Sequence, residues 1–208
     1  MISFILIALY YSMFIYRHFL TSDMIAIADF IIFISLFTFS IIYNFKILRR
    51  HLKRLLNDIK INIKSIIIYS IITAIIYFVA TFIIGYFMQS FAITKEAVQD
   101  SDLTRVFINL LIWAPITEEL LFRSLLNKDI KNKQLLIVLS SILFAGVHVI
   151  GNGFNLITLI NFIPYFIIGM YLGFLYRKTN NIVINIIMHL LINVIGVVMI
   201  LTMVYWNQ

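Results

Sequence analysis

The sequence contains no cysteine and very little proline, glycine or charge. Its 208 residues include 2 Pro and 7 Gly, and only 12% of them are Asp, Glu, Lys or Arg. The missing cysteines exclude disulfide scaffolds, thiolate metal sites and cysteine nucleophiles. Soluble domains carry about 25% charged residues, so the composition also excludes an ordinary water-soluble domain, a disordered chain and a nucleic-acid-binding module.

Apolar residues make up 62% of the chain, and the mean hydropathy is +1.03. A helix needs about 20 mostly apolar residues to cross a bilayer, and continuous apolar runs favour helices over a β-barrel. We therefore predict an all-α, polytopic membrane helical bundle that forms a single integral membrane domain over residues 1–208. The predicted spans, about seven in number, are Met1–Tyr16, Met24–Phe45, Ser65–Phe91, Val106–Leu126, Gln134–Ile150, Leu156–Tyr176 and Ile182–Tyr205.

The basic residues predict the orientation of these spans. The loop from Lys46 to Lys64 and the loops after the fourth and sixth spans together hold 12 of the 16 Lys and Arg. With seven spans these loops lie on one side, so the positive-inside rule predicts a cytoplasmic N-terminus in a multi-pass protein of the cell membrane. The first of these loops is expected to set topology, with a solvated His51. The sparser opposite side holds Arg17, Lys95 and Arg105.

Proline and glycine predict local helix geometry in two spans. Pro115 lies three residues before Glu118 and loosens the preceding turn, which favours a small polar pocket there. Pro164 can kink the sixth span. Gly169 and Gly173 form a GxxxG pattern that permits close helix packing.

Ionisable residues inside the spans cluster in the second half of the chain. Each costs about 2.5–3.5 kcal/mol to insert and marks a functional cavity by default. Residues four apart share a helix face, whereas neighbouring Glu118 and Glu119 point about 100° apart. The spacing therefore predicts three side-chain pairs, which are Glu119 with Arg123, Phe144 with His148, and His189 with Asn193.

These residue types suit hydrolysis of a peptide bond by an activated water. A carboxylate and an imidazole can together deprotonate and orient a water, and a second imidazole with an amide can donate to a developing oxyanion. Zinc chemistry is the competing interpretation, with Glu118, His148 and His189 as candidate ligands. The HExxH pattern is missing, and spacing alone leaves both interpretations open.

The same residues resemble the motifs of the CPBP family of intramembrane proteases. That family includes the type II CAAX prenyl endopeptidases and the bacterial Abi proteins linked to bacteriocin immunity. Its EExxxR, FxxxH and HxxxN motifs occur here in order and on predicted spans. The resemblance covers about residues 103–196, a catalytic core that leaves the spans of residues 1–91 outside it. Ser124 stands where the family often has glycine, and we expect it to affect packing only.

The resemblance implies an endopeptidase with defined residue roles. Glu118 would be the general base assisted by His148, and His189 with Asn193 would form the oxyanion site. Glu119, Arg123 and the motif residue Phe144 would support them. The implied mechanism is glutamate-dependent, with no obligatory cofactor and zinc as the possible metal. The expected partners are the lipid bilayer and a membrane-associated peptide or protein substrate, with no nucleic acid.

Two other functions remain open at this point. A non-catalytic bacteriocin-immunity factor or scaffold would use the same polar cluster to bind a peptide or partner. A small transporter would use the acids and imidazoles as a proton relay, although no inverted repeat is visible in the sequence. Loss of the Glu118 carboxylate separates a protease from a binding protein, because only the protease depends on that group for chemistry.

Overall fold

The computed structural model describes residues 2–15, 21–57, 59–88, 108–150, 153 and 155–206. The regular structure of these residues is entirely helical, in seven helices. This confirms the all-α prediction. In chain order they are α1 (Ile2–Ile15), α2 (Ser22–Asn57), α3 (Ile59–Met88), a rod over 109–129, α8 (Lys133–Val149), α9 (Leu156–Thr179) and α10 (Ile182–Trp206).

Four of these helices are long and apolar enough to cross a membrane, so the protein is a polytopic helical membrane protein. The candidate spans are Ile27–Asn57, Ile63–Phe82, Leu156–Thr179 and Ile182–Met199. The apolar stretches Ile2–Met13 and Lys133–Val149 are shorter. The seven expected spans thus correspond to seven helices, of which four have full spanning length among the described residues. The N-in orientation stays a prediction, and Arg17, Lys95 and Arg105 lie outside the described residues.

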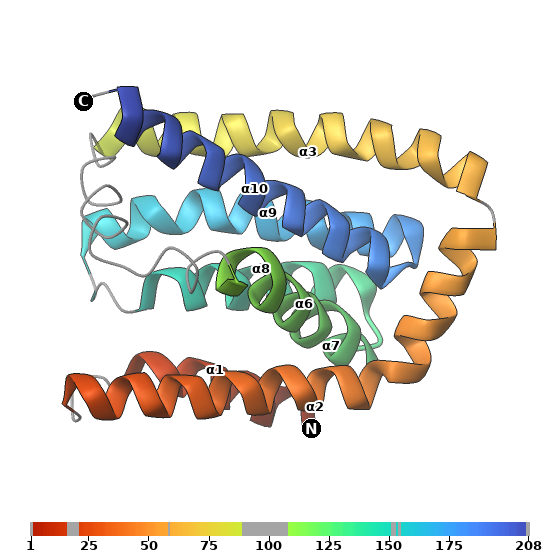
Figure 1. The fold of residues 1–208 in the computed structure, drawn as a ribbon, viewed down its shortest axis with the longest axis horizontal. Helices are drawn as coiled ribbons and strands as arrows, with labels where there is room; N and C mark the ends of the chain where they lie inside the picture. The colour runs from red at the N-terminus through yellow and green to blue at the C-terminus, as the bar shows by residue number, and fades with distance from the viewer. Residues whose placement is uncertain are drawn as a thin grey trace.

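The helices are arranged around the rod of residues 109–129 and the α8–α9 pair. Figure 1 shows α1 and α2 along one edge of the molecule, α3 along the opposite edge, and the remaining helices between them. Helix α9 packs against α8, α3 and α10, whereas the rod contacts α1, α2, α8 and α10. The rod that carries the two acids therefore lies inside the bundle, with helices from both halves of the chain around it.

The basic segment between the second and third predicted spans was expected to be a loop that sets topology, with a surface helix on anionic lipid headgroups as the alternative, and its described residues are helical. Helix α2 continues to Asn57, and α3 begins at Ile59. Charged residues do not end a helix, because Lys and Arg are good helix formers. The extension brings His51 to the start of α10, where its Nδ1 accepts a hydrogen bond from the N–H of Ile182 at 2.9 Å. His51 is 7% exposed, so the prediction of a solvated side chain is wrong.

Glycines allow α8 and α9 to approach closely. A Cβ at Gly169 would lie 3.0 Å from Cα of Ser141, and one at Gly173 would lie 3.2 Å from Cγ2 of Ile137. Side chains at these two positions would hold the helices apart. The close packing predicted from the GxxxG pattern is therefore confirmed.

The rod changes its helical winding on both sides of the acids. It consists of the π-helix η2 (Asn109–Trp113), α6 (Ala114–Glu119), the π-helix η3 (Leu120–Leu125) and α7 (Leu126–Asp129). The N–H of Ala114 donates to the carbonyl of Asn109, five residues back, and Pro115 has no N–H to continue a regular ladder. Wide turns of this kind often occur at functional sites, and here they lie directly before and after the turn that carries Glu118 and Glu119.

Candidate active site

Glu119 forms the fixed centre of a buried polar network. Its side chain is fully buried. Its Oε2 accepts a hydrogen bond from Nδ2 of Asn185 at 3.0 Å and lies 3.7 Å from Nε of Arg123. Its Oε1 lies 3.0 Å from Nδ1 of His189. Two hydrogen bonds from α10 and the charge of Arg123 therefore hold one carboxylate in place, which limits the cost of burying it.

Arg123 links this network to the neighbouring helices. Its Nη2 donates to the carbonyl of Gly169 at 3.1 Å, and its guanidinium carbon lies 5.4 Å from the ring centroid of Phe144. The predicted pair with Glu119 is confirmed as an ion pair. Its 3.7 Å separation exceeds a good hydrogen bond.

Glu118 lies beside this network with one of its two oxygens unpartnered. The side chain is buried, and Oε1 accepts a hydrogen bond from the Tyr10 hydroxyl at 2.8 Å. Oε2 lies 3.8 Å from Nε2 of His189 and has no hydrogen-bond partner among the described residues. A buried carboxylate oxygen without a partner is costly, and this atom remains able to accept a hydrogen from a bound reactant.

The ring of His189 lies between the two acids. Nδ1 faces Glu119, and Nε2 faces Glu118. The guanidinium of Arg123 stays charged in proteins, so Glu119 opposite it is a carboxylate, which can only accept. Nδ1 of His189 therefore carries the hydrogen of that bond, and Nε2 is left facing Glu118.

His148 lies on the other side of Phe144. Its Nδ1 donates to the carbonyl of Phe144 at 2.8 Å, and its ring stacks on Tyr165 with centroids 4.3 Å apart. The Phe144 ring lies 4.6 Å from the His148 ring and 5.5 Å from the His189 ring. The predicted packing of Phe144 under His148 is confirmed, and the same ring also contacts His189.

Asn193 lies one turn beyond His189 on α10 and bonds to the start of the rod. Its Nδ2 donates to the carbonyl of Leu110 at 2.6 Å. One amide hydrogen is used in this contact, and the second remains for another acceptor. The structure thus brings Glu118, Glu119, Arg123, Phe144 and His189 together. The shared oxyanion role of His189 and Asn193 stays a prediction.

The donor set does not form a metal site in this arrangement. No group of three His, Asp or Glu side chains among the described residues is placed to hold a metal ion. Glu118 and His189 approach each other, whereas the His148 ring stacks on Tyr165 and packs against Phe144. Glu118, His148 and His189 thus do not fit as a ligand set here, and no step below is routed through a metal.

Two residues of the site were missed by the motif-based prediction. Asn185 lies four residues before His189 and hence on the same helix face, so its spacing carried a usable signal. It also donates to the carbonyl of Leu172 at 2.7 Å, which ties α9 to α10. Tyr10 carries no such signal, because the partner of its hydroxyl is 108 residues away.

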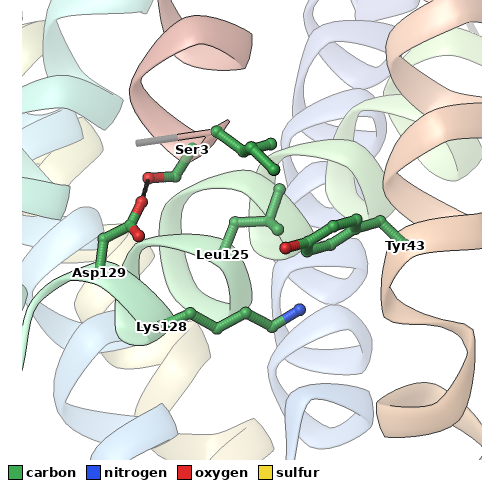
Figure 2. Close-up of a pocket in the computed structure, with 6 residues that line it drawn as sticks. Ser3, Tyr43, Leu125, Lys128 and Asp129 are labelled. Carbon is green, nitrogen blue, oxygen red and sulfur yellow. Dashed lines mark hydrogen bonds between the residues drawn. The ribbon is translucent and has the colours of Figure 1, made fainter.

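A separate pocket of about 270 Å³ lies between α1, α2 and the end of the rod. Figure 2 shows Ser3 directed toward Asp129, which it contacts through a hydrogen bond, and Lys128 directed toward the Tyr43 ring. The ammonium nitrogen of Lys128 lies 4.0 Å from the centre of that ring. The lining residues include none of the predicted site residues, so this pocket is separate from the acid cluster. The contact between Ser3 and Asp129 beside it joins α1 to the end of the rod.

Comparison with known proteins finds a family match in the second half of the chain. Residues 100–195 match the family described as type II CAAX prenyl endopeptidase, Rce1-like. This matched segment, which covers just under half of the chain, is called the Rce1-like domain here. The resemblance noted over residues 103–196 is thereby confirmed. The Rce1-like domain includes every predicted site residue, whereas α1, α2 and α3 precede it.

One relative is similar to part of the chain. The UPF0177 protein YxdF of Lactococcus lactis subsp. lactis (strain IL1403) is 39% identical over 85 residues, which cover 41% of this chain and 44% of the relative. The matched segment therefore spans less than half the length of that relative. No solved structure matches the chain.

Proposed function

We propose that the protein is an intramembrane endopeptidase that hydrolyses a peptide bond in a membrane-associated peptide or protein. The observation that carries this proposal is the unpartnered Oε2 of Glu118, which is buried 3.8 Å from Nε2 of His189. A general base needs a free oxygen within reach of the proton it removes. The Rce1-like domain supports the proposal at the level of the family.

The proposed reaction begins with a water bound at Oε2 of Glu118. The carboxylate accepts a proton from this water, whose oxygen forms a bond to the scissile carbonyl carbon. The carbon–nitrogen bond then breaks, and the proton passes from Glu118 to the leaving amine. The products are one new carboxyl terminus and one new amino terminus, so the water supplies every added atom.

The neighbouring imidazoles and amide have supporting roles in this proposal. Protonated His189 donates from Nε2 to the developing oxyanion, and the second amide hydrogen of Asn193 is the other donor. His148 assists the proton transfers. Glu119, Arg123 and Asn185 keep the His189 ring in one orientation through the contacts at 3.0 and 3.7 Å.

The burial of the polar network favours catalysis over simple packing. Glu119 and Arg123 form a buried ion pair that a structural role would explain. Glu118 adds a second buried acid with an unsatisfied oxygen, which stabilises nothing in the resting structure. A group of this kind is expected where the missing partner is a reactant.

Comparative peptidomics tests the proposal without a known substrate. Cells lacking the protein are complemented with wild type, Glu118→Gln or Asp129→Asn, at matched membrane levels. The control removes the same kind of charge from an exposed acid on α7, whose hydrogen bond to Ser3 lies outside the acid cluster and can still form with asparagine. New peptide termini are expected with wild type and Asp129→Asn only.

The same experiment separates the alternatives. Identical termini with wild type and Glu118→Gln would contradict the protease. If Glu118→Gln also rescued the cellular phenotype, the non-catalytic immunity or scaffold function would be favoured. A chelator arm addresses the mechanism, since the glutamate-dependent reaction is expected to persist, and loss of cleavage restored by zinc would favour the metal alternative.

A further inference from the structure

We propose that Tyr10, which lies on α1 and outside the Rce1-like domain, is a positioning residue for Glu118. This inference rests on the proposed function, because it assigns Tyr10 a part in the same site. Its basis is the hydrogen bond from the Tyr10 hydroxyl to Oε1 of Glu118 at 2.8 Å. Both side chains are buried, with 5% and 3% of their surfaces exposed.

The position of Tyr10 is set by apolar packing. Helix α1 packs against η3 of the rod, and the Tyr10 ring lies 6.3 Å from the Phe122 ring, measured between centroids. Phe122 in turn meets Phe144 edge-on at 6.1 Å. The tyrosine ring is therefore held by the same aromatic cluster that contacts His189, which leaves the hydroxyl little freedom to turn away from the acid.

The hydrogen bond distinguishes the two oxygens of Glu118. A carboxylate that accepts at neither oxygen can rotate about its terminal bond, and each oxygen then spends time in each position. The Tyr10 hydroxyl holds Oε1, which leaves Oε2 facing His189 as the free atom. Tyr10 thus pre-orients the base, and orientation of a reactive group is itself a source of catalysis.

Tyr11 supplies a matched control on the next residue of the same helix. Its hydroxyl also makes a hydrogen bond, to the backbone carbonyl of Leu143 on α8, and its side chain is half-buried. Changing either tyrosine to phenylalanine removes one hydroxyl and one hydrogen bond while keeping the ring. Only the change at position 10 alters the surroundings of Glu118.

The first readout is the hydrolysis of a peptide containing the cleavage site found by peptidomics, by the full chain in liposomes. Tyr10→Phe is expected to lower kcat about tenfold, as expected for loss of a hydrogen bond to a charged group, and to keep KM within about twofold. Tyr11→Phe is expected to match wild type. A Tyr10→Phe protein with unchanged kcat, or equal losses in the two variants, would overturn the positioning role.

The second readout does not depend on proteolysis. Dicyclohexylcarbodiimide enters membranes and modifies carboxyl groups in their protonated form, and mass spectrometry gives the ratio of modified Glu118 to modified Glu119. Tyr10→Phe is expected to raise this ratio severalfold, since Oε1 loses its donor, whereas Tyr11→Phe leaves it unchanged. An unchanged ratio in Tyr10→Phe would overturn the inference.

The two readouts separate the failure of this inference from that of the proposed function. A wild-type protein that hydrolyses no peptide, but still shows the contrast in labelling, would contradict the protease and leave the Tyr10 contact supported. Thermal unfolding of each variant checks folding. If Tyr10→Phe does not fold, Tyr10→Met takes its place, with the same expected directions in both readouts.

Discussion

The two halves of the molecule both bury neutral polar groups, but among the described residues they differ in whether they also bury charged side chains. Among the described residues, the C-terminal half (108–206) buries the charged side chains Glu118, Glu119 and Arg123. The N-terminal half (2–88) buries hydroxyls, an amide and an imidazole, which are Ser3, Ser40, Asn44, His51 and Thr73. Charge is expensive in a membrane, and it is concentrated in the half that matches a protease family. The difference indicates that the C-terminal half carries the chemistry.

The N-terminal half nevertheless reaches the site through neutral hydrogen bonds. Tyr10 donates to Glu118, and His51 accepts from the first residue of α10. Asn44 accepts a hydrogen bond from Ser124 at 2.8 Å. Ser124 was expected to affect packing only, but it also ties the rod to α2. The N-terminal half therefore positions the helices of the C-terminal half, which carries the buried charged residues.

The largest effect is expected for Glu118→Gln. General-base catalysis contributes about 10²–10⁴-fold, so hydrolysis should fall by that factor or more. Thermal unfolding should change little, because glutamine keeps the shape and can still accept from Tyr10. The measurement is the rate of peptide cleavage together with the unfolding midpoint in detergent. Residual activity within tenfold of wild type would show that the base lies elsewhere.

The next effect is on stability and concerns Arg123→Met. It leaves the Glu119 carboxylate buried beside a neutral side chain, which costs about 3–5 kcal/mol. The double variant Glu119→Gln, Arg123→Met should recover most of this loss, because no charge is left without its partner. The measurement is the unfolding midpoint of the single and the double variant in detergent. Equal destabilisation of the single and double variants would show that the Glu119–Arg123 ion pair does not contribute to stability.

A smaller effect is expected at the contact between α8 and α9. Gly169→Ala places a methyl group 3.0 Å from backbone Cα of Ser141, and overpacking of this kind costs about 1–3 kcal/mol. Gly173→Ala is the matched control, since its methyl group meets the side chain of Ile137, which can move. Similar unfolding midpoints for both variants would contradict the close backbone contact. Peptide cleavage should also slow in Gly169→Ala, because displacement of residue 169 would move the carbonyl that accepts a hydrogen bond from Arg123.

The smallest effect is expected for His51→Ala in the N-terminal half. It removes the acceptor for the N–H of Ile182 at the start of α10, and loss of such a cap costs about 1 kcal/mol. Hydrogen exchange should become faster over the first turn of α10 and stay unchanged in α8. An unchanged exchange rate at Ile182 would show that the cap contributes nothing, and the N-terminal half would then act through Tyr10 and Asn44.

The sequence predicted those parts of the site that lie within one helix. Glu119 with Arg123 and Phe144 with His148 follow from a spacing of four residues, and Asn185 with His189 could have been read in the same way. The hydrogen bonds of Tyr10 and His51 could not, since they join residues 108 and 131 positions apart. Such contacts depend on how α1 and α2 pack, which periodicity does not encode.

The number and type of helices were also predictable, but their ends were less so. Apolar composition defined seven helices and the all-α class. Helix α2 extends 12 residues past the predicted boundary at Phe45, because basic residues mark the edge of a membrane and not the end of a helix. The π-helices of the rod were also missed, although Pro115 pointed to a loosened turn.

The central claim is that Glu118 activates a water that cuts a peptide bond. Cleavage in water enriched in oxygen-18 tests this claim most directly, with membranes containing wild type or Glu118→Gln and mass spectrometry of the new carboxyl termini. The account predicts one oxygen-18 atom in each new terminus with wild type, and no such termini with Glu118→Gln. Labelled termini at equal levels in both membranes would contradict it.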